Sequence, residues 1–481
     1  MKRILALCLS LLLLYGCTTV QTPKQQPQQP KETQQNEEQT EEQTLEKTQQ
    51  ETREETTEET VSSVDEEKPS EQPEAEEAPL TWVTDLPKVS FVPDWTVESS
   101  SEEFLLELSD PKYQGRVTGS AGNRAAADYI EEQFIRLGLQ QLPDLESYRQ
   151  SFYSPVFEVA PGEAWVVSSD GTQTSLTLGK DWVFRASYEA VDLTLPLSEN
   201  FSDCEEGRAF LDVNAMGAIY PHQYIHVISG DVEKGIAYFN PKDYASRIMV
   251  TEEVYAKLKQ DGAKLRLKLP AAAQRGEADN VAGFFPGENR TKAVVLGAHF
   301  DGVGQCGSVM PGAYDNASGV ATLIQTAAWL SKADRLPCDV IVVAFNAEEI
   351  GLNGSRSFAN LLADQYEQIL MINIDCVGWK GEPSAVFGAM ENSNLRNELA
   401  GGLGIPFKNE VYAGDQFSFQ QRGIPAVTIS QGDWNKKECI HSTRDTAENL
   451  DPKQMDALAK DLSAWVIERG SDAQERYPVF W

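Results

Sequence analysis

Apolar runs alternate with amphipathic segments along the second half of the chain, from about residue 280 onward. Three of the runs are short, at 293–296, 340–345 and 369–374, and only Asn373 in the third is polar. Runs of this kind between helical segments are typical of parallel strands that are buried on both faces. Helices are expected between and after them, at 317–329, 355–362 and 452–469. The pattern predicts an α/β fold with a mixed, largely parallel central sheet and helices on both of its faces.

Two other patterns precede this alternation. Apolar residues recur near helical spacing within 125–139 and end at a glycine, which predicts an amphipathic helix. Between residues 151 and 270, short alternating runs are separated by Gly, Asp and Ser turns, which predicts a small β-rich domain with one helical segment at 252–262. We therefore expect a β-rich insert at 151–270 within a main domain formed by 81–150 and 271–481.

The amino terminus has the pattern of an export signal. Lys2 and Arg3 precede the apolar run Ile4–Leu14, which is too short to span a bilayer. The run is followed by LLYGC, ending at Cys17, which resembles the lipobox of bacterial lipoproteins. This resemblance implies that residues 1–16 are a signal peptide, that Cys17 is lipidated, and that the chain is exported and lipid-anchored to the cell envelope on its extracytoplasmic side.

The segment 17–80 is rich in Gln, Glu, Thr and Pro and has almost no large apolar side chains. Such a composition cannot bury enough surface to offset the entropy of ordering, so we predict a disordered tether. Residues 18–80 contain 18 acidic and 5 basic side chains, which contributes −13 to the formal net charge of −33. The acidic excess of the remaining chain argues against nucleic acid or an anionic surface as a partner.

Titratable side chains follow the first apolar run, where a strand is expected to end. His299 and Asp301 lie on either side of Phe300, and a Gly-rich loop then leads to Asp315, just before a predicted helix. Sites in parallel sheets form at the carboxyl ends of the strands. Because zinc takes imidazole and carboxylate ligands together, these residue types predict a metal site, although polar capping alone would place similar residues here.

Similar side chains follow the later runs. Glu348 and Glu349 come after the second run, and two adjacent carboxylates at a buried strand end need a cation or a proton to be tolerated. Asp375 follows the third run, and His441 lies in IHSTRDTAENLD near the carboxyl terminus. The chain has 4 histidines, and two of them fall in these loops. The repeated coincidence favours a metal centre over helix capping.

Five motifs in this order resemble one known family. AHFDG, PGAYDNASG, NAEEIGLNGS, NIDCVG and IHSTRDT are similar to the motifs of the co-catalytic di-zinc aminopeptidases, metallopeptidase family 28. The earlier segment YQGRVTGSAGNRAAADYIEEQF resembles the amino-terminal helix region of that family. The resemblance covers about 100–150 and 278–470 and implies the zinc exopeptidase fold. The block between them would then be an insert that resembles a protease-associated domain.

The resemblance also implies roles for individual residues. It implies two Zn²⁺ ions per chain, bridged by Asp315. One ion would be completed by His299 and Asp375, and the other by Glu349 and His441. Glu348 would be the general base. Asp301 would orient the imidazole ring of His299, since a metal-bound imidazole usually donates its second N–H to a carboxylate.

The sequence departs from the family in two places. Tyr314 stands where the family usually has an acidic residue before the bridging aspartate. Gln416 stands where a His or Tyr is more usual, after Asp415 at the acidic position of a loop that lies near the substrate in the family. Asp415 is therefore a candidate for substrate binding, and Tyr412 is a candidate for contacting the tetrahedral intermediate.

The implied function is that of an exopeptidase that hydrolyses the amino-terminal bond of peptide substrates with a metal-activated water. A carboxypeptidase of the same fold is an alternative, and Arg356, Arg422 and Arg444 could hold its substrate carboxylate, although no arginine cluster occurs in the motifs. A glutaminyl cyclase, another relative, would be expected to use one zinc. A catalytically silent surface binding protein would suit the tether, but the presence of all five ligand positions argues against it.

Overall fold

The computed structural model describes residues 80–158, 161–184, 190–200, 210–216, 225–232, 247–271, 273–362, 364–432 and 439–470. All of them belong to one structural unit, Glu76–Trp481. The predicted signal peptide, the predicted lipidation site Cys17 and the predicted tether lie outside the described residues, apart from Leu80 at the end of the tether. Within the described part of the chain, no helix combines the length and the apolar character needed to cross a membrane.

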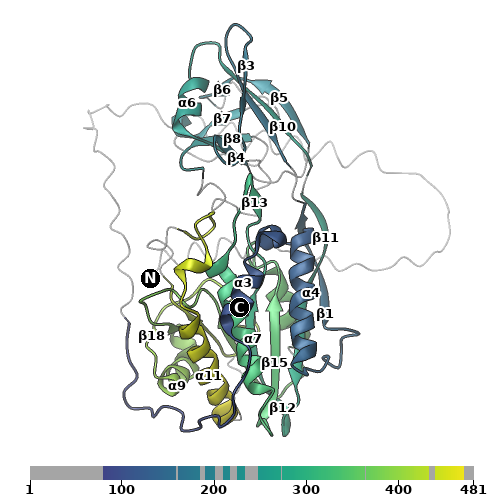
Figure 1. The fold of residues 1–481 in the computed structure, drawn as a ribbon, viewed down its shortest axis with the longest axis vertical. Coiled ribbons are helices and arrows are strands. Elements are labelled where there is room, and N and C mark those ends of the chain that lie inside the picture. The colour runs from purple at the N-terminus through teal and green to yellow at the C-terminus, as the bar shows by residue number, and fades with distance from the viewer. Residues whose placement is uncertain are drawn as a thin grey trace, which may run out of the picture. The chain divides into compact units, whose positions relative to one another are not determined.

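A mixed sheet of eight strands forms the centre of this unit (Figure 1), in the order β1-β11-β15-β12-β16-β19-β17-β18. The strands β15, β12, β16 and β19 are parallel to one another, whereas β11 is antiparallel to both β1 and β15. At the other side, β17 is antiparallel to β19 and parallel to β18. The expected mixed, largely parallel sheet is thus confirmed. The strand bounds are β1 Arg149–Phe157, β11 Ala273–Phe285, β12 Asn289–His299, β15 Cys338–Phe345, β16 Gln368–Ile374, β17 Ala385–Phe387, β18 Phe407–Lys408 and β19 Ala426–Ser430.

The helices cover both faces of this sheet. Along β12, Val294 and Leu296 enter one hydrophobic core, and Ala293 and Val295 enter the other. This alternation explains why the run Ala293–Leu296 in β12 is apolar at successive positions. The first core contains residues of α3 Ser101–Leu108, α4 Ala121–Arg136, α7 Ser318–Leu330, α9 Ser393–Leu403 and α11 Pro452–Arg469. The second contains Phe358 of α8 Asn353–Leu362 and Phe419 of α10 Gln416–Gln420.

Local side chains determine where these helices begin. The helix α4 begins four residues before the expected 125 because the side chain of Ser120 accepts a hydrogen bond from the backbone N–H of Asn123. The helix α11 begins at Pro452, as expected, and the side chain of Asp451 accepts a hydrogen bond from the N–H of Lys453.

The β-rich block forms two smaller sheets around a core of its own. One sheet has the order β3-β2-β10-β5 and the other β4-β9-β8-β7-β6, with α6 Glu252–Leu258 at the predicted helical segment. The strand β1 crosses the expected boundary at residue 151 and pairs with β11, so the chain leaves the central sheet only after Phe157. The remaining bounds are β2 Glu163–Val167, β3 Gln173–Leu176, β4 Trp182–Phe184, β5 Val191–Leu195, β6 Leu197–Ser198, β7 Phe210–Asp212, α5 Val213–Met216, β8 Ile225–Ser229, β9 Arg247–Val250 and β10 Lys264–Leu269.

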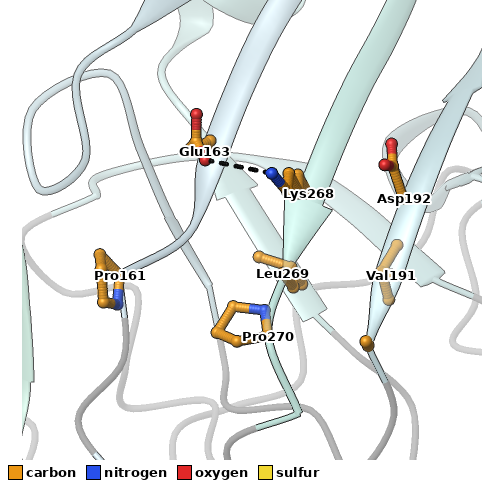
Figure 2. A pocket seen from close by; sticks show the side chains of 8 residues that line it. Pro161, Glu163, Val191, Asp192, Lys268, Leu269 and Pro270 are labelled. Atoms are coloured by element: carbon orange, nitrogen blue, oxygen red, sulfur yellow. Dashed lines mark ion pairs between the residues drawn. The ribbon is translucent and has the colours of Figure 1, made fainter.

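Figure 2 shows a pocket of about 400 Å³ in this block. A loose ion pair lies on its wall, with Lys268 Nζ at 3.8 Å from Glu163 Oε1, a separation at which partly exposed pairs contribute little free energy. No residue predicted to bind metal or substrate is among those that line the pocket, which are Pro161, Glu163, Ala190, Val191, Asp192, Lys268, Leu269 and Pro270.

Candidate metal centre

The predicted ligands lie at the carboxyl ends of three neighbouring parallel strands. His299 is the last residue of β12, and Asp375 directly follows β16. Glu349 comes four residues after the end of β15, which lies beside β12 in the sheet. Asp315 lies in the short π-helical turn Ala313–Ala317 that leads into α7, and His441 lies in the segment between β19 and α11. The topology of the sheet therefore places these residues at the same edge.

These five side chains form two groups that share one member. The first group is His299, Asp315 and Asp375, and the second is Asp315, Glu349 and His441; the ligand atoms within each lie within 4.8 Å of one another. The Nε2 atom of His299 lies 3.3 Å from Asp315 Oδ1 and 3.6 Å from Asp375 Oδ1. The Nε2 atom of His441 lies 3.1 Å from Asp315 Oδ2 and 3.0 Å from Glu349 Oε1.

The donor atoms of this site fit a divalent metal such as zinc. Two imidazole nitrogens and three carboxylates form a mixed nitrogen and oxygen set, which zinc accepts. Asp375 Oδ1 is buried and makes no hydrogen bond within the described part of the chain. A buried carboxylate oxygen without a partner is costly, so these residues are better satisfied by a cation than by one another.

The charges of the site shift the pKa values of its own groups. Burial raises the pKa of Glu348 and of Glu349, and neighbouring carboxylates add to the shift, although a histidine opposes it in each case. Burial alone would lower the pKa of His299 and of His441, but the surrounding carboxylates outweigh it and raise both values well above the usual range. Without a metal the site therefore holds protons tightly.

We expect the metal-free protein to lose stability as the pH rises. Burial raises the pKa of Asp445 from 3.8 to about 7, and the two glutamates and two histidines shift in the same direction. A group whose pKa is higher in the folded state than in the unfolded state stabilises the folded state at pH values below its unfolded-state pKa. This stabilisation is lost as the pH rises through the folded-state pKa, which for these groups means from about pH 4 to pH 7 and above. The lowered pKa of Asp315 acts in the opposite direction, but only at lower pH.

Zinc should reverse this trend because its ligands bind in their deprotonated forms. Thermal unfolding between pH 4 and pH 8, with zinc or with a chelator, tests the prediction. A midpoint that rises with pH in the chelated protein would contradict it.

Asp301 holds the loop of the two glutamates. Its carboxylate accepts hydrogen bonds from the backbone N–H of Glu348, at 3.1 Å, and of Glu349, at 3.3 Å, and from the hydroxyl of Thr118. The Nδ1 atom of His299 lies 3.2 Å from the backbone oxygen of Asp301 and 3.6 Å from its carboxylate. Both the backbone oxygen and the carboxylate of Asp301 therefore lie near the second nitrogen of the imidazole, and its role in orienting the ring stays a prediction.

Arg116 holds two loops of the site together, although no pattern in the sequence predicts a role for it. Its side chain is 1% exposed and donates hydrogen bonds to the backbone oxygens of Phe300 and Pro311, both at 2.8 Å, of Gly312 at 2.9 Å and of Leu108 at 2.5 Å. Phe300 adjoins His299 and Gly312 precedes the turn of Asp315. One guanidinium group therefore ties together the two loops that carry these ligands. The only signal in the sequence was its place in the segment YQGRVTGSAGN.

We expect Arg116→Met to lower the free energy of unfolding by about 3 kcal/mol or more, because buried carbonyl groups lose their donor. Arg116→Lys should also destabilise, since an ammonium group cannot reproduce the planar arrangement of donors. Arg136→Met removes an exposed pair with Glu132 and serves as the control, with an expected loss below about 0.5 kcal/mol. Urea unfolding of the metal-free variants measures these values, and equal losses for Arg116→Met and Arg136→Met would contradict the prediction.

Two further buried side chains hold the turn that contains Asp315. The carboxylate of Asp445 accepts hydrogen bonds from the backbone N–H of Tyr314, at 2.7 Å, and of Asp315, at 3.1 Å. The side chain of Asn316 donates a hydrogen bond to the backbone oxygen of Ile374, at 3.0 Å. Ile374 directly precedes the predicted ligand Asp375. These contacts fix the position of the shared carboxylate relative to the strand end.

The two candidates for substrate contact lie in buried positions. Tyr412 is 5% exposed and packs edge-on against Phe387, and its hydroxyl accepts a hydrogen bond from Ser430 at 3.2 Å. Asp415 is fully buried, and burial and the carboxylate of Asp375 raise its pKa to about 7, with a partial offset from His299. Their roles toward substrate stay predictions.

The fold and the site together define an α/β protein with a two-part metal-binding centre at the carboxyl ends of its parallel strands. Residues 280–466 match the model of peptidase family M28. Probable lipoprotein aminopeptidase LpqL of Mycobacterium tuberculosis is 33% identical over 115 residues, which are 24% of this chain and 22% of that protein.

A second relative is leupeptin-inactivating enzyme 1 of Streptomyces exfoliatus, 26% identical over 245 residues, which cover 45% of this chain and 55% of that protein. The chain thus spans between about a fifth and about half of these two relatives. Among solved structures, BSAP, a zinc aminopeptidase from Bacillus subtilis, matches with a TM-score of 0.54 and 19% identity, over 76% of this chain and 93% of that one. This likeness shows that the chain has the same fold.

Proposed function

We propose that this protein is a di-zinc aminopeptidase, an exopeptidase that removes amino-terminal residues from peptides. The observation that carries the proposal is the position of Asp315, whose two carboxylate oxygens face two different histidines, at 3.3 Å from His299 and 3.1 Å from His441. A carboxylate shared in this way is what two neighbouring divalent cations need, because its charge offsets their repulsion. His299 and Asp375 would hold one zinc, and Glu349 and His441 the other.

Glu348 is the proposed general base. When bound, zinc would supply Lewis-acid chemistry that polarises a scissile carbonyl and lowers the pKa of water. Glu348 is partly exposed and belongs to neither of the two ligand groups found among the described residues. As a carboxylate that is not a ligand, it could take a proton from the attacking water and pass it to the leaving amine. Asp301 positions it through the backbone N–H groups of the loop.

Two observations favour the amino end of the peptide over the carboxyl end. The similar proteins include ones named as aminopeptidases. Two of the arginines that could receive a substrate carboxylate have partners within the chain: Arg356 donates to the backbone oxygen of Gly351, and Arg444 lies 3.9 Å from the carboxylate of Asp231. The full ligand set also favours an enzyme over a silent binding protein.

We further propose that the protein acts outside the cytoplasm, anchored by a lipid on Cys17. The signal-like amino terminus and the acidic tether support this proposal, as does the similarity to a protein named as a probable lipoprotein. Metabolic labelling with a fatty-acid analogue, compared between the natural chain and Cys17→Ala, tests it. Equal labelling of both chains would contradict it.

The test of the enzymatic proposal uses one purified sample for two measurements. We expect two zinc ions per chain, and cleavage of a free-amino peptide but not of its N-acetylated form. The C-amidated form should be cleaved as well as the parent peptide. Cleavage blocked by amidation instead would indicate a carboxypeptidase, and absence of both zinc and cleavage would indicate a binding protein.

A further inference from the structure

The chain between two of the metal-site residues, His299 and Asp315, makes a detour to the β-rich block. It forms a small hairpin of β13 Gln305–Cys306 and β14 Ser308–Val309 before it returns to the site. The tip of the hairpin is Gly307, at φ +76°, where a Cβ atom would lie 2.4 Å from the backbone oxygen of Leu178 in the block. The backbones of the hairpin and the block therefore touch directly, in a way that only glycine allows.

Met310 follows this hairpin and is buried in the β-rich block. It is 3% exposed and packs in one hydrophobic cluster with Val183 of β4, Met249 of β9 and Val232. Val303, from the same detour, packs against this cluster as well. The buried members of this cluster are distinct from those of the main core of the block, although Leu178 and Phe184 pack against both.

The residues between Met310 and Asp315 are held from the opposite side. Arg116 donates hydrogen bonds to the backbone oxygens of Pro311, at 2.8 Å, and Gly312, at 2.9 Å. The backbone N–H of Met310 also donates to the oxygen of Gly304, at 3.1 Å, which closes the detour. Only four residues, 311–314, thus separate the apolar anchor Met310 from Asp315. Over so short a segment, a shift of the anchor reaches the carboxylate.

We propose that the β-rich block is a structural part of the metal centre and that Met310 is a positioning residue for Asp315. The block would hold one end of the ligand loop and Arg116 the other. Arg444, which lies three residues after His441, has its Nη2 atom 3.9 Å from Asp231 Oδ2 of the block, but so long and exposed an ion pair contributes little free energy. This inference rests on the proposed zinc centre.

The test compares zinc affinity in the full-length protein and in variants of the anchor, measured by competition with a chromogenic chelator. Met310→Ala should weaken zinc binding by about 10- to 100-fold, as expected for residues that support metal ligands from outside the first shell. Met310→Leu should restore binding to within about threefold, because it keeps most of the volume. Val183→Ala, on the block side of the contact, should weaken zinc binding in the same direction.

Leu267→Ala is the matched control, since it removes a fully buried side chain from the separate core of the block. It should lower the thermal midpoint as Met310→Ala does but leave zinc affinity unchanged. Unchanged zinc affinity in Met310→Ala would overturn the inference. If Met310→Ala does not fold, unchanged zinc affinity in Val183→Ala would overturn it instead. Absence of zinc binding by the natural protein would refute the metal centre itself, whereas natural zinc binding with unaffected variants would refute only the role of the block.

Discussion

Glu348→Gln should lower kcat by about 10²- to 10⁴-fold while the zinc content stays that of the natural protein. Glutamine keeps the size and shape of the side chain but cannot accept a proton. Glu348 lies outside both ligand groups of the described residues, so its removal should leave the donor atoms of the metals intact. The hydrogen bond from its backbone N–H to Asp301 is unaffected by the change.

The matched control for this prediction is Glu349→Gln, on the neighbouring residue. Glu349 Oε1 lies 3.0 Å from His441 Nε2 and belongs to the second ligand group, so its amide should weaken zinc binding. Zinc content and kcat measured on both variants separate the two roles. Loss of zinc from Glu348→Gln, with retention in Glu349→Gln, would show that the two roles are exchanged.

Asp315→Asn should disrupt the metal centre as a whole, with loss of zinc from both ligand groups and loss of activity with it. The natural side chain offers one oxygen to each histidine, whereas an asparagine has one oxygen and an amide nitrogen that cannot bind a cation. The variant also removes the negative charge that two neighbouring cations would share. Zinc titration monitored by calorimetry should show weaker binding for both ions, and kcat should not recover in excess zinc.

Tyr314→Phe is the control for this second prediction. Tyr314 is fully buried next to Asp315 but supplies no ligand, so the variant tests disturbance of the same turn without loss of a donor atom. We expect its zinc binding to match that of the natural protein. Circular dichroism of the metal-free forms shows whether each variant folds. Loss of only one zinc from Asp315→Asn would show that the carboxylate does not bridge.

Much of the fold could be predicted from local patterns. The runs 293–296, 340–345 and 369–374 became strands in the centre of the sheet, and the helix expected at 452–469 has those bounds. These elements follow from the burial of both sheet faces and from capping, which depend on neighbouring residues. The position of β1 was not predicted, because its partner β11 lies more than 100 residues away and only the pairing assigns it to the central sheet.

The sequence by itself determined the residue types of the site and their order along strand ends. His299, Asp315 and Asp375 could be singled out because parallel topology brings the ends of strands to one edge. The supporting residues could not be found in this way. Arg116 and Asp445 bind backbone groups up to 196 residues distant in the chain, and no local pattern marks a side chain whose partners are backbone atoms elsewhere.

Only the tertiary structure decided how the ligands are shared and what holds them. It placed two histidines, 142 residues apart in the sequence, on the two oxygens of one aspartate. It also packed Met310 against Val183 and Met249 of a block that the sequence pattern treated as separate. The physical reason is that donor chemistry belongs to individual side chains, whereas distances between donors are determined by packing among segments that the chain brings together only on folding.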